Sequence, residues 1–124
     1  MRRAVRYGDA WHPIHSRMSW LREKGVPRLR YLADAEQKKV PDFCPRIHLR
    51  RTEKRLEDET RLPGEGTLDQ IRGDLETLSS LGAEYVLFDT YTGDPEDRKS
   101  PDHDWRMFAT LADKVLDLGH QSLR

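Results

Sequence analysis

The chain has 124 residues, enough for one domain with a modest core but too few for a closed eight-stranded barrel of about 250 residues. Apolar and charged residues each make up 35% and the mean hydropathy is -0.89, which excludes a membrane span. The zero net charge is uneven: residues 1–62 carry 16 Lys and Arg against 9 Asp and Glu (+7), and residues 63–124 carry 6 against 13 (−7).

The charge distribution has two interpretations. The two halves either pack together and neutralise each other, or the basic half faces an anionic cofactor or substrate. The densest basic run, RIHLRRTEKR, is followed at once by LEDE, so we expect no nucleic-acid binding. The N-terminal MRRAVRYGDA lacks the apolar segment of a signal peptide, which predicts a cytoplasmic protein. Cys44 is the single cysteine, so no intramolecular disulfide can form, and we expect a partly buried thiol.

The first part of the chain predicts a helix end, a strand and a longer helix. Residues 1–7 are typical of the last turns of a helix that ends at Gly8, and a short strand follows over 9–13. Ser16 is placed to cap a helix over 16–39, which carries an interruption around Gly25 and Pro27. The next segment, KKVPDFCP, contains two prolines and is predicted as a loop.

A strand is predicted over 46–52, because apolar and polar residues alternate there. Ile47 and Leu49 share one face, and three polar residues share the other: Arg46, His48 and Arg50. Residues 53–66 are highly charged and contain Pro-Gly and a second glycine, which indicates a mobile surface loop.

The clearest unit runs from Thr67 to Tyr91 and comprises a helix, a turn and a buried strand. Thr67 and Gln70 have the spacing of a capping box at the helix start. One helical face carries the apolar residues Leu68, Ile71, Leu75 and Leu78. Gly82 suits a left-handed position after the helix, and the strand over 85–91 is apolar without alternation. A strand of this kind is typical of a parallel α/β sheet covered by helices.

The end of the chain predicts a polar loop and a last helix. The loop, TGDPEDRKSPDHD, has the length of a lid or a disordered insert. The helix is predicted over 103–118, with Gly119 ending it. Its apolar stripe consists of Trp105, Phe108, Leu111, Ala112, Val115 and Leu116.

Together these segments predict three consecutive strand–helix repeats. They are the pairs 9–13 with 16–39, 46–52 with 67–81, and 85–91 with 103–118. Parallel strands joined by helices cross over right-handed, so the fold class is α/β, as a half-layer or a slice of a (βα) barrel. Ligands bind beyond the carboxyl ends of such strands, which makes Asp89, Thr90 and Tyr91 the first functional candidates.

The segment RRAVRYGDAWHP resembles the A-R-x-A-x-R-x-G-D-G-W-x-P stretch of the luciferase-like monooxygenase family, the flavin- and deazaflavin-dependent (βα)8 barrels. Downstream, the chain is similar to the family's G-T-x-x-x-I-x-x-x-L-x-x-L-x-x-L-G-x-x-x-x-x-x-D pattern. The matching residues are Gly66, Thr67, Ile71, Leu75, Leu78, Gly82 and Asp89. The resemblance covers nearly the whole chain and corresponds to the C-terminal portion of the family's barrel, so residues 1–124 are expected to form one domain.

The resemblance implies a partial TIM barrel of about three parallel βα units and a flavin-dependent oxidoreductase or monooxygenase. The implied cofactor is FMN or a deazaflavin coenzyme at the C-terminal mouth, with a small-molecule substrate. The candidate cofactor-binding residues are Trp11, His12, Arg50, Asp89 and Tyr91; no catalytic residue is assigned. Ala10 stands where the family prefers glycine. The upstream strands of the barrel are absent, so activity is expected to require a partner chain or self-association that completes it.

Each candidate also has a structural interpretation. Trp11 can be a core residue and His12 a surface cap. His12 and His15 have the spacing of some zinc ligands, but Pro13 between them prevents the helical geometry that would bring both onto one face, so no metal site is expected.

Arg50 can bind a phosphate or carboxylate, or it can pair with the nearby Glu53 or Glu57. Asp89 can act at the site or accept backbone N–H bonds from the loop that follows it. The alternative function is a non-catalytic module or barrel remnant that binds a small ligand such as a phosphorylated metabolite.

Overall fold

The computed structural model describes residues 1–124. Its helical segments are α1 (Arg2–Tyr7), α2 (Met18–Trp20), the π-helical turn η1 (Leu21–Gly25), α3 (Val26–Ala35), α4 (Leu68–Ser80), the short η2 (Pro95–Asp97) and α5 (Pro101–Lys114). Its strands are β1 (Ala10–Trp11), β2 (Asp42–Phe43), β3 (Arg46–His48), β4 (Arg50–Arg51), β5 (Glu65–Gly66), β6 (Leu87–Asp89), β7 (Leu116–Asp117) and β8 (Ser122–Leu123). No helix is long and apolar enough to cross a membrane.

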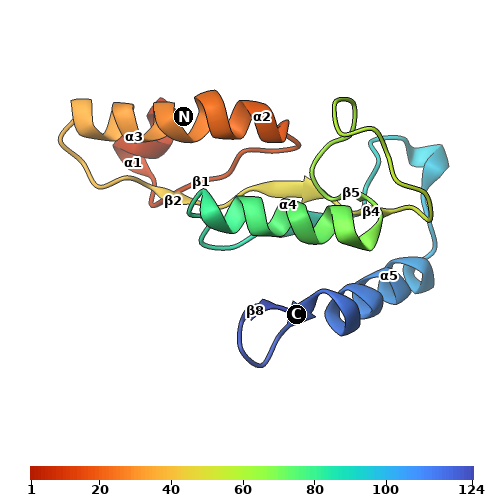
Figure 1. Cartoon of the computed structure of the whole chain (residues 1–124). Coiled ribbons are helices and arrows are strands. Elements are labelled where there is room, and N and C mark those ends of the chain that lie inside the picture. Colours follow the sequence, from red (N-terminus) through yellow and green to blue (C-terminus); the bar gives the residue numbers. More distant parts are fainter.

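Three extended segments run parallel and side by side through the middle of the molecule (Figure 1). β1 pairs with β2, and β3, which continues β2, pairs with β6. Isolated parallel bridges between Ile14 and Arg46 and between Phe43 and Ala83 extend both pairings. The α/β class is therefore observed, as short parallel strand pairs with no closed barrel.

The middle segment begins earlier than its sequence predicts, because β2 lies within the stretch predicted as a loop. Proline removes only its own N–H from a ladder. The Pro45 carbonyl still accepts from the Leu87 N–H at 3.0 Å, and Asp42 and Cys44 donate to the first segment. The two prolines thus interrupt the hydrogen bonds of the strand without ending it. Cys44, between them, is a free thiol and is fully buried.

α1 ends where the sequence predicts, whereas the helical region from α2 to α3 begins differently from the prediction. α1 ends at Gly8 as predicted. The second region is continuous from Met18 to Ala35. The π-helical turn η1 lies where an interruption was predicted and directly precedes Pro27, whose missing N–H leaves a gap in the hydrogen bonds of this continuous helix. A Cβ at Gly25 would lie 2.7 Å from the Trp20 ring, so this glycine makes room for the indole. Ser16 does not cap this region; its N-cap residue is Arg17, without a side-chain bond.

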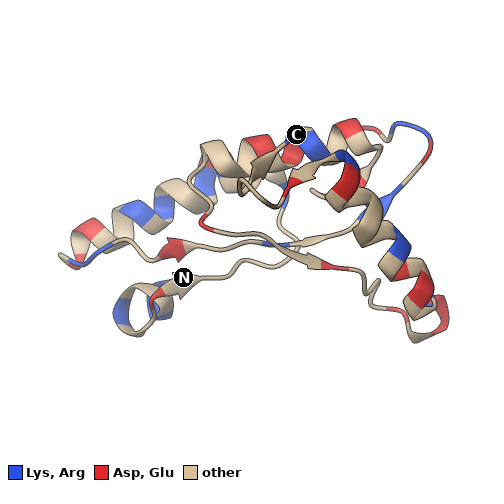
Figure 2. Cartoon of the chain, turned by 90° about the horizontal axis from the view of Figure 1, so that it is seen from below, with Lys and Arg blue, Asp and Glu red and all other residues tan.

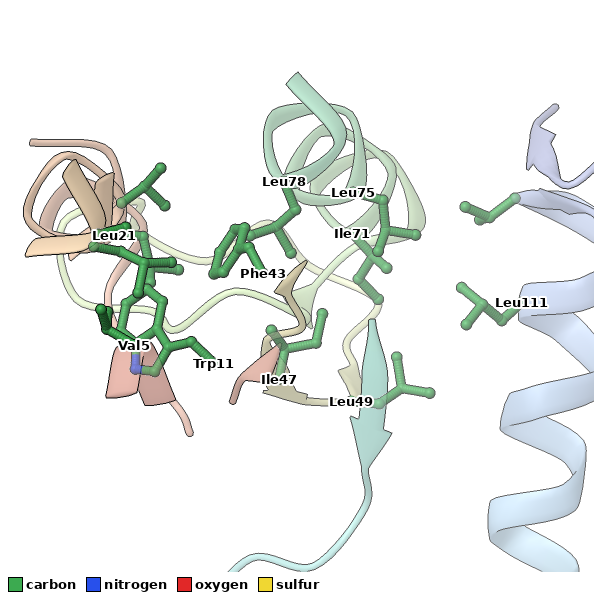
Figure 3. Packing of buried hydrophobic residues seen from close by; sticks show 14 residues of the cluster. Val5, Trp11, Leu21, Phe43, Ile47, Leu49, Ile71, Leu75, Leu78 and Leu111 are labelled. Carbon is green, nitrogen blue, oxygen red and sulfur yellow. The ribbon is translucent and has the colours of Figure 1, made fainter. Parts of the chain in front are cut away.

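Helix α4 forms as its sequence predicts. Both hydrogen bonds of the capping box between Thr67 and Gln70 are present, and Gly82 has a φ of 88°. Its apolar face packs on the strands: Leu78 points toward Phe43, and Ile71 toward Ile47 (Figure 3). These contacts join α4 to the middle segment of the sheet.

Residues 53–66, predicted as a mobile loop, are instead held against the sheet and α4. β5 pairs in parallel with β4. Arg61 forms a bidentate ion pair with Asp74 of α4, at 2.6 and 2.9 Å, and both side chains are almost fully buried. The high charge of this segment therefore reflects internal ion pairing as well as solvent exposure.

The C-terminal region differs from the prediction in where its helix ends. Ser100 caps α5, which stops at Lys114, and β7 and β8 then form an antiparallel hairpin with Gly119 in its turn. Leu111 and Val115 are buried as predicted, but Trp105 is 71% exposed and takes no part in the core. The stripe is buried only near the end of α5 that contacts α4 and the hairpin.

One face of the sheet is covered by helices and the other is not. α3 and α4 lie along the same side of the strands (Figures 2 and 3). Residues paired across parallel strands share a face, so the opposite side carries Ile14, Arg46 and Leu87, followed by His48 and Asp89. Ile14 and Leu87 are 55% and 42% exposed. These five residues define what we call the open face.

Candidate functional site

Polar side chains from four separate segments meet on the open face near the carboxyl ends of the strands. His15 follows β1, Arg46 and His48 belong to β3, Glu65 belongs to β5, and Asp89 ends β6. We call these five residues the polar cluster. In a parallel α/β sheet this is the end at which ligands bind.

Asp89 is the most fully bonded carboxylate of the polar cluster. Its Oδ2 atom accepts from Arg46 Nε at 2.9 Å and Nη2 at 2.5 Å, and its Oδ1 atom accepts from the Tyr91 N–H at 3.0 Å. His15 Nε2 lies 3.2 Å from Oδ2. Burial alone would raise the pKa of Asp89, but the Tyr91 N–H and the Arg46 guanidinium outweigh it and leave the pKa below its usual value.

His48 and Glu65 form the second pair of the polar cluster. His48 Nδ1 lies 2.9 Å from Glu65 Oε1, while Oε2 lies 3.3 Å from Arg50 Nη2. Burial pushes the pKa of Glu65 up, yet the bonds from His48, the Leu62 N–H and Arg50 bring it below its usual value. The other imidazole nitrogen, His48 Nε2, is shielded from solvent and has no hydrogen-bond partner.

His15 lies beside His48 in a strained backbone conformation. Its φ is 47°, in the left-handed region that costs a residue other than glycine on the order of 1–3 kcal/mol. Its backbone N–H donates to the Arg46 carbonyl at 3.0 Å, which keeps it attached to the middle segment. The two imidazole centroids are 5.8 Å apart. This conformation places the His15 ring beside His48 and its Nε2 atom 3.2 Å from Asp89 Oδ2.

Close backbone contact brings Glu65 to the polar cluster. Gly64 has a φ of 87°, and a Cβ there would lie 2.0 Å from the His48 carbonyl oxygen. The Gly64 N–H donates to Asp74 at 2.8 Å, and Arg61 donates to the Glu65 carbonyl at 3.0 Å. Only glycine fits this approach, and the buried ion pair holds the segment in place.

Two of the candidate cofactor-binding residues lie away from the polar cluster. Trp11 is only 8% exposed and stacks on Phe43 with a centroid distance of 5.7 Å, within the core. His12 donates from Nδ1 to the Cys44 carbonyl at 2.6 Å. Trp11 therefore contributes to packing between β1 and the helices, and His12 ties the first segment to the second.

The other three candidates lie at or near the strand ends. Arg50 pairs with Glu65, whereas its neighbour Arg51 contacts Glu53 at 3.1 Å. Asp89 is in the polar cluster and also accepts the backbone N–H of Tyr91. Tyr91 is half-exposed and lines a separate cleft of about 440 Å³ between the end of β6 and the start of α5.

Sequence reasoning did not identify four members of the polar cluster as site residues. Alternation placed Arg46 and His48 on the polar face of their strand, a signal that was available but not used. Glu65 was hidden in a segment predicted as mobile, and His15 was considered only as a metal ligand beside His12. No group of three or more His, Cys, Asp or Glu residues is arranged to hold a metal ion.

No family model matches the chain, and no curated protein matches it. The chemistry of the cluster therefore follows from its own geometry. Arg46 and Asp89 form a closed ion pair that fixes the end of β6. His15 and His48 supply imidazole nitrogens, each of which can donate or accept a hydrogen bond according to its tautomer.

Proposed function

We propose that the chain is the C-terminal part of a luciferase-like (βα)8 barrel, acting as a flavin- or deazaflavin-dependent oxidoreductase on a small molecule once another chain covers its open face. The observation that supports this most strongly is the parallel sheet with helices on one side and a polar cluster on the other, at the carboxyl ends of the strands. In (βα)8 enzymes that end of the barrel carries the active site.

The order of elements supports the same proposal. The first segment leads to α2 and α3, the middle one to α4, and β6 to α5, so each strand is followed by a helix. The middle segment lies between the first and the third. This is the strand order of consecutive units in a βα barrel, whose interior would then be formed by the open face.

The open face fits the ring system of the proposed cofactor better than it fits a phosphate. Ile14 and Leu87 offer exposed apolar surface beside the imidazoles of the polar cluster. A bound flavin or deazaflavin would supply the hydride chemistry, and this chain would supply binding and orientation. Arg46 and Arg50 are already paired with carboxylates, so we expect the phosphate to be held by another chain. The same pairing leaves the phosphorylated-metabolite alternative without support on this face.

The sheet also has features that favour association. The outer edges of β1 and β6 have no strand partner, and unpaired edges readily add a further strand. Residues 1–62 carry a net charge of +7 and residues 63–124 a net charge of −7, although basic and acidic positions are mixed along the individual helices (Figure 2). A second copy or a partner chain that covers the open face would bury its apolar residues.

Fluorescence titration with FMN and with a deazaflavin coenzyme tests the proposal. We expect the unmodified chain to quench the fluorescence of the added cofactor. Ile14→Glu on the open face should cause a large loss of affinity for the cofactor. Tyr31→Glu, at a residue of α3 that is 71% exposed, should leave the affinity unchanged. Absence of quenching by either compound at high concentration would remove the enzyme interpretation for the isolated chain. Equal loss with both variants would show that binding does not occur at the open face.

A further inference from the structure

His48 has the arrangement of a histidine oriented for proton transfer. A carboxylate can only accept, so the 2.9 Å contact with Glu65 puts a proton on Nδ1 and leaves the Nε2 lone pair free. A carboxylate in this place fixes the tautomer and stabilises the imidazolium that forms when Nε2 takes a proton. A buried nitrogen without a partner is costly in a residue that serves packing alone.

The position of Glu65 is set by its backbone and by its carboxylate. The Arg50 N–H donates to the Gly64 carbonyl at 3.0 Å and the Thr52 N–H to the Gly66 carbonyl at 2.8 Å, one on each side of Glu65. The carboxylate itself receives the second contact from Arg50. Glu65 is therefore held against His48 by the pairing of β4 and β5.

His15 is the outer of the two neighbouring imidazoles. Its side chain is 33% exposed, whereas that of His48 is 11% exposed, and the Nε2 atoms of both are shielded from solvent. The contact of His15 with Asp89, at 3.2 Å, lacks the geometry of a hydrogen bond. A ring that is strained at its backbone and weakly held at its tip is well suited to move.

We propose that His48 and Glu65 form an acid–base pair on the open face, covered by the His15 side chain, for a small substrate that presents a hydroxyl or carbonyl oxygen. When His15 moves aside, His48 Nε2 takes the proton of a hydroxyl: the O–H bond breaks, the N–H bond forms, and the electron pair stays on the oxygen. A carbonyl oxygen would receive a proton in the reverse direction. The pair deepens the proposed function and uses the same face.

A metal site is the main alternative for two histidines beside a carboxylate. Asp89 Oδ2, the atom nearest to His15, already accepts two bonds from Arg46. The positive guanidinium opposes a cation at that position. The remaining groups, His48 and Glu65, are bonded to each other through Nδ1. The arrangement therefore favours proton transfer.

Nitrogen-15 NMR of the imidazoles tests the pair without any cofactor. At pH 8, we expect neutral His48 to carry its proton on Nδ1, and we expect Glu65→Ala to shift it toward the Nε2–H tautomer. The matched control is Glu53→Ala, which removes an exposed carboxylate from the loop between β4 and β5 and should leave the tautomer of His48 unchanged. An Nε2–H tautomer in the unmodified chain would overturn the pair.

Diethyl pyrocarbonate, which reacts with unprotonated imidazole nitrogens, tests whether the His15 side chain covers His48. Mass spectrometry should find slow modification of His48 in the unmodified chain and modification several-fold faster in His15→Gly. Glycine suits the left-handed φ of position 15, so this variant keeps the backbone conformation. His12→Ala is the control and should leave the rate at His48 unchanged. An unchanged rate in His15→Gly would overturn the role of His15, whatever the outcome of the cofactor titrations.

Discussion

Asp74 is the residue on which the position of the Glu65 segment depends most. Its carboxylate accepts two bonds from Arg61 and one from the Gly64 N–H, and its side chain is 6% exposed. Asp74→Ala removes the buried carboxylate of the pair, leaves the Gly64 N–H without its acceptor and leaves Arg61 with only the half-exposed Asp58 as a charged partner. We therefore expect the free energy of unfolding to fall by about 3–5 kcal/mol. Chemical denaturation measures this.

Asp69 is the matched control for Asp74, since it lies in the same helix and also contacts an arginine. The Asp69 side chain is 88% exposed and its contact with Arg72 is 3.4 Å long. Asp69→Ala should change the free energy of unfolding by about 0.5 kcal/mol or less. Similar losses in the two variants would show that burial of the Arg61 pair does not determine its contribution.

Two glycines give opposite predictions for the same substitution. Gly64→Ala forces a Cβ into the His48 carbonyl at a positive φ, so we expect a loss above about 1–3 kcal/mol. Gly73 lies inside α4 with no atom within 4 Å of a Cβ, so Gly73→Ala should stabilise by about 1 kcal/mol. Thermal unfolding of both variants measures the difference. A stable Gly64→Ala variant would contradict the close approach of β5 to β3.

The lowered pKa of Asp89 predicts how stability depends on pH. Because the folded-state pKa is below the unfolded value of about 3.9, ionised Asp89 stabilises the fold above that pH, and this contribution is lost as the pH falls further. We expect the stability difference between the unmodified chain and Asp89→Asn to be constant near neutrality and to shrink below about pH 4. Urea denaturation at several pH values measures it. A difference independent of pH would contradict the ion pair with Arg46.

At the scale of elements, α4 is specified locally and other parts are not. Its capping box, apolar face and Gly82 end lie within a few residues of each other in sequence, and all three form as predicted. The π-helical turn η1 and the early end of α5 involve contacts outside the helical pattern: Gly25 lies against Trp11 and Trp20, and residues 116–123 pair as a hairpin directly after α5. Local periodicity does not contain these contacts.

The Thr67 cap of α4 is expected to contribute measurably to the stability of the fold. Thr67→Ala removes the acceptor for the Gln70 N–H, so we expect the free energy of unfolding to fall by about 1 kcal/mol. Thr110 is the control: it is a partly exposed threonine within α5 whose hydroxyl donates to the Arg106 carbonyl, and Thr110→Ala should be close to neutral. Chemical denaturation compares them, and equal effects would contradict a specific role of the cap.

At the scale of the whole molecule, the uncovered face and the separated charges predict self-association. Light scattering should give a mass above that of one chain at low salt, falling as salt is raised. Leu87→Glu on the open face should reduce association, and Tyr31→Glu on the outer side of α3 should not. A monomer insensitive to salt would contradict association driven by these features.

How much of the site was predictable differs from residue to residue. Asp89 was selected because it follows a strand predicted to be buried on both faces; the prediction of burial was wrong for one face, since Tyr85 and Leu87 are 56% and 42% exposed. The alternation of residues 46–50 placed Arg46 and His48 on one face. Glu65 was not predictable, because its position depends on an ion pair between residues 13 apart in sequence and on a glycine whose conformation is set by the neighbouring strand. Trp11 was ambiguous, since an aromatic residue at a strand end suits a core or a pocket equally.

The sequence by itself determined the helix with its caps, the parallel direction of the strands and the division of the middle strand into an apolar and a polar face. The helix and the two faces of the strand depend on spacings of two to four residues. The parallel direction follows from the helix that connects each strand to the next. Only the tertiary structure decided which polar side chains meet, because His15, His48, Glu65 and Asp89 come from segments far apart in sequence. Their contacts arise from strand register, two left-handed backbone positions and one buried ion pair, none of which has a local signature.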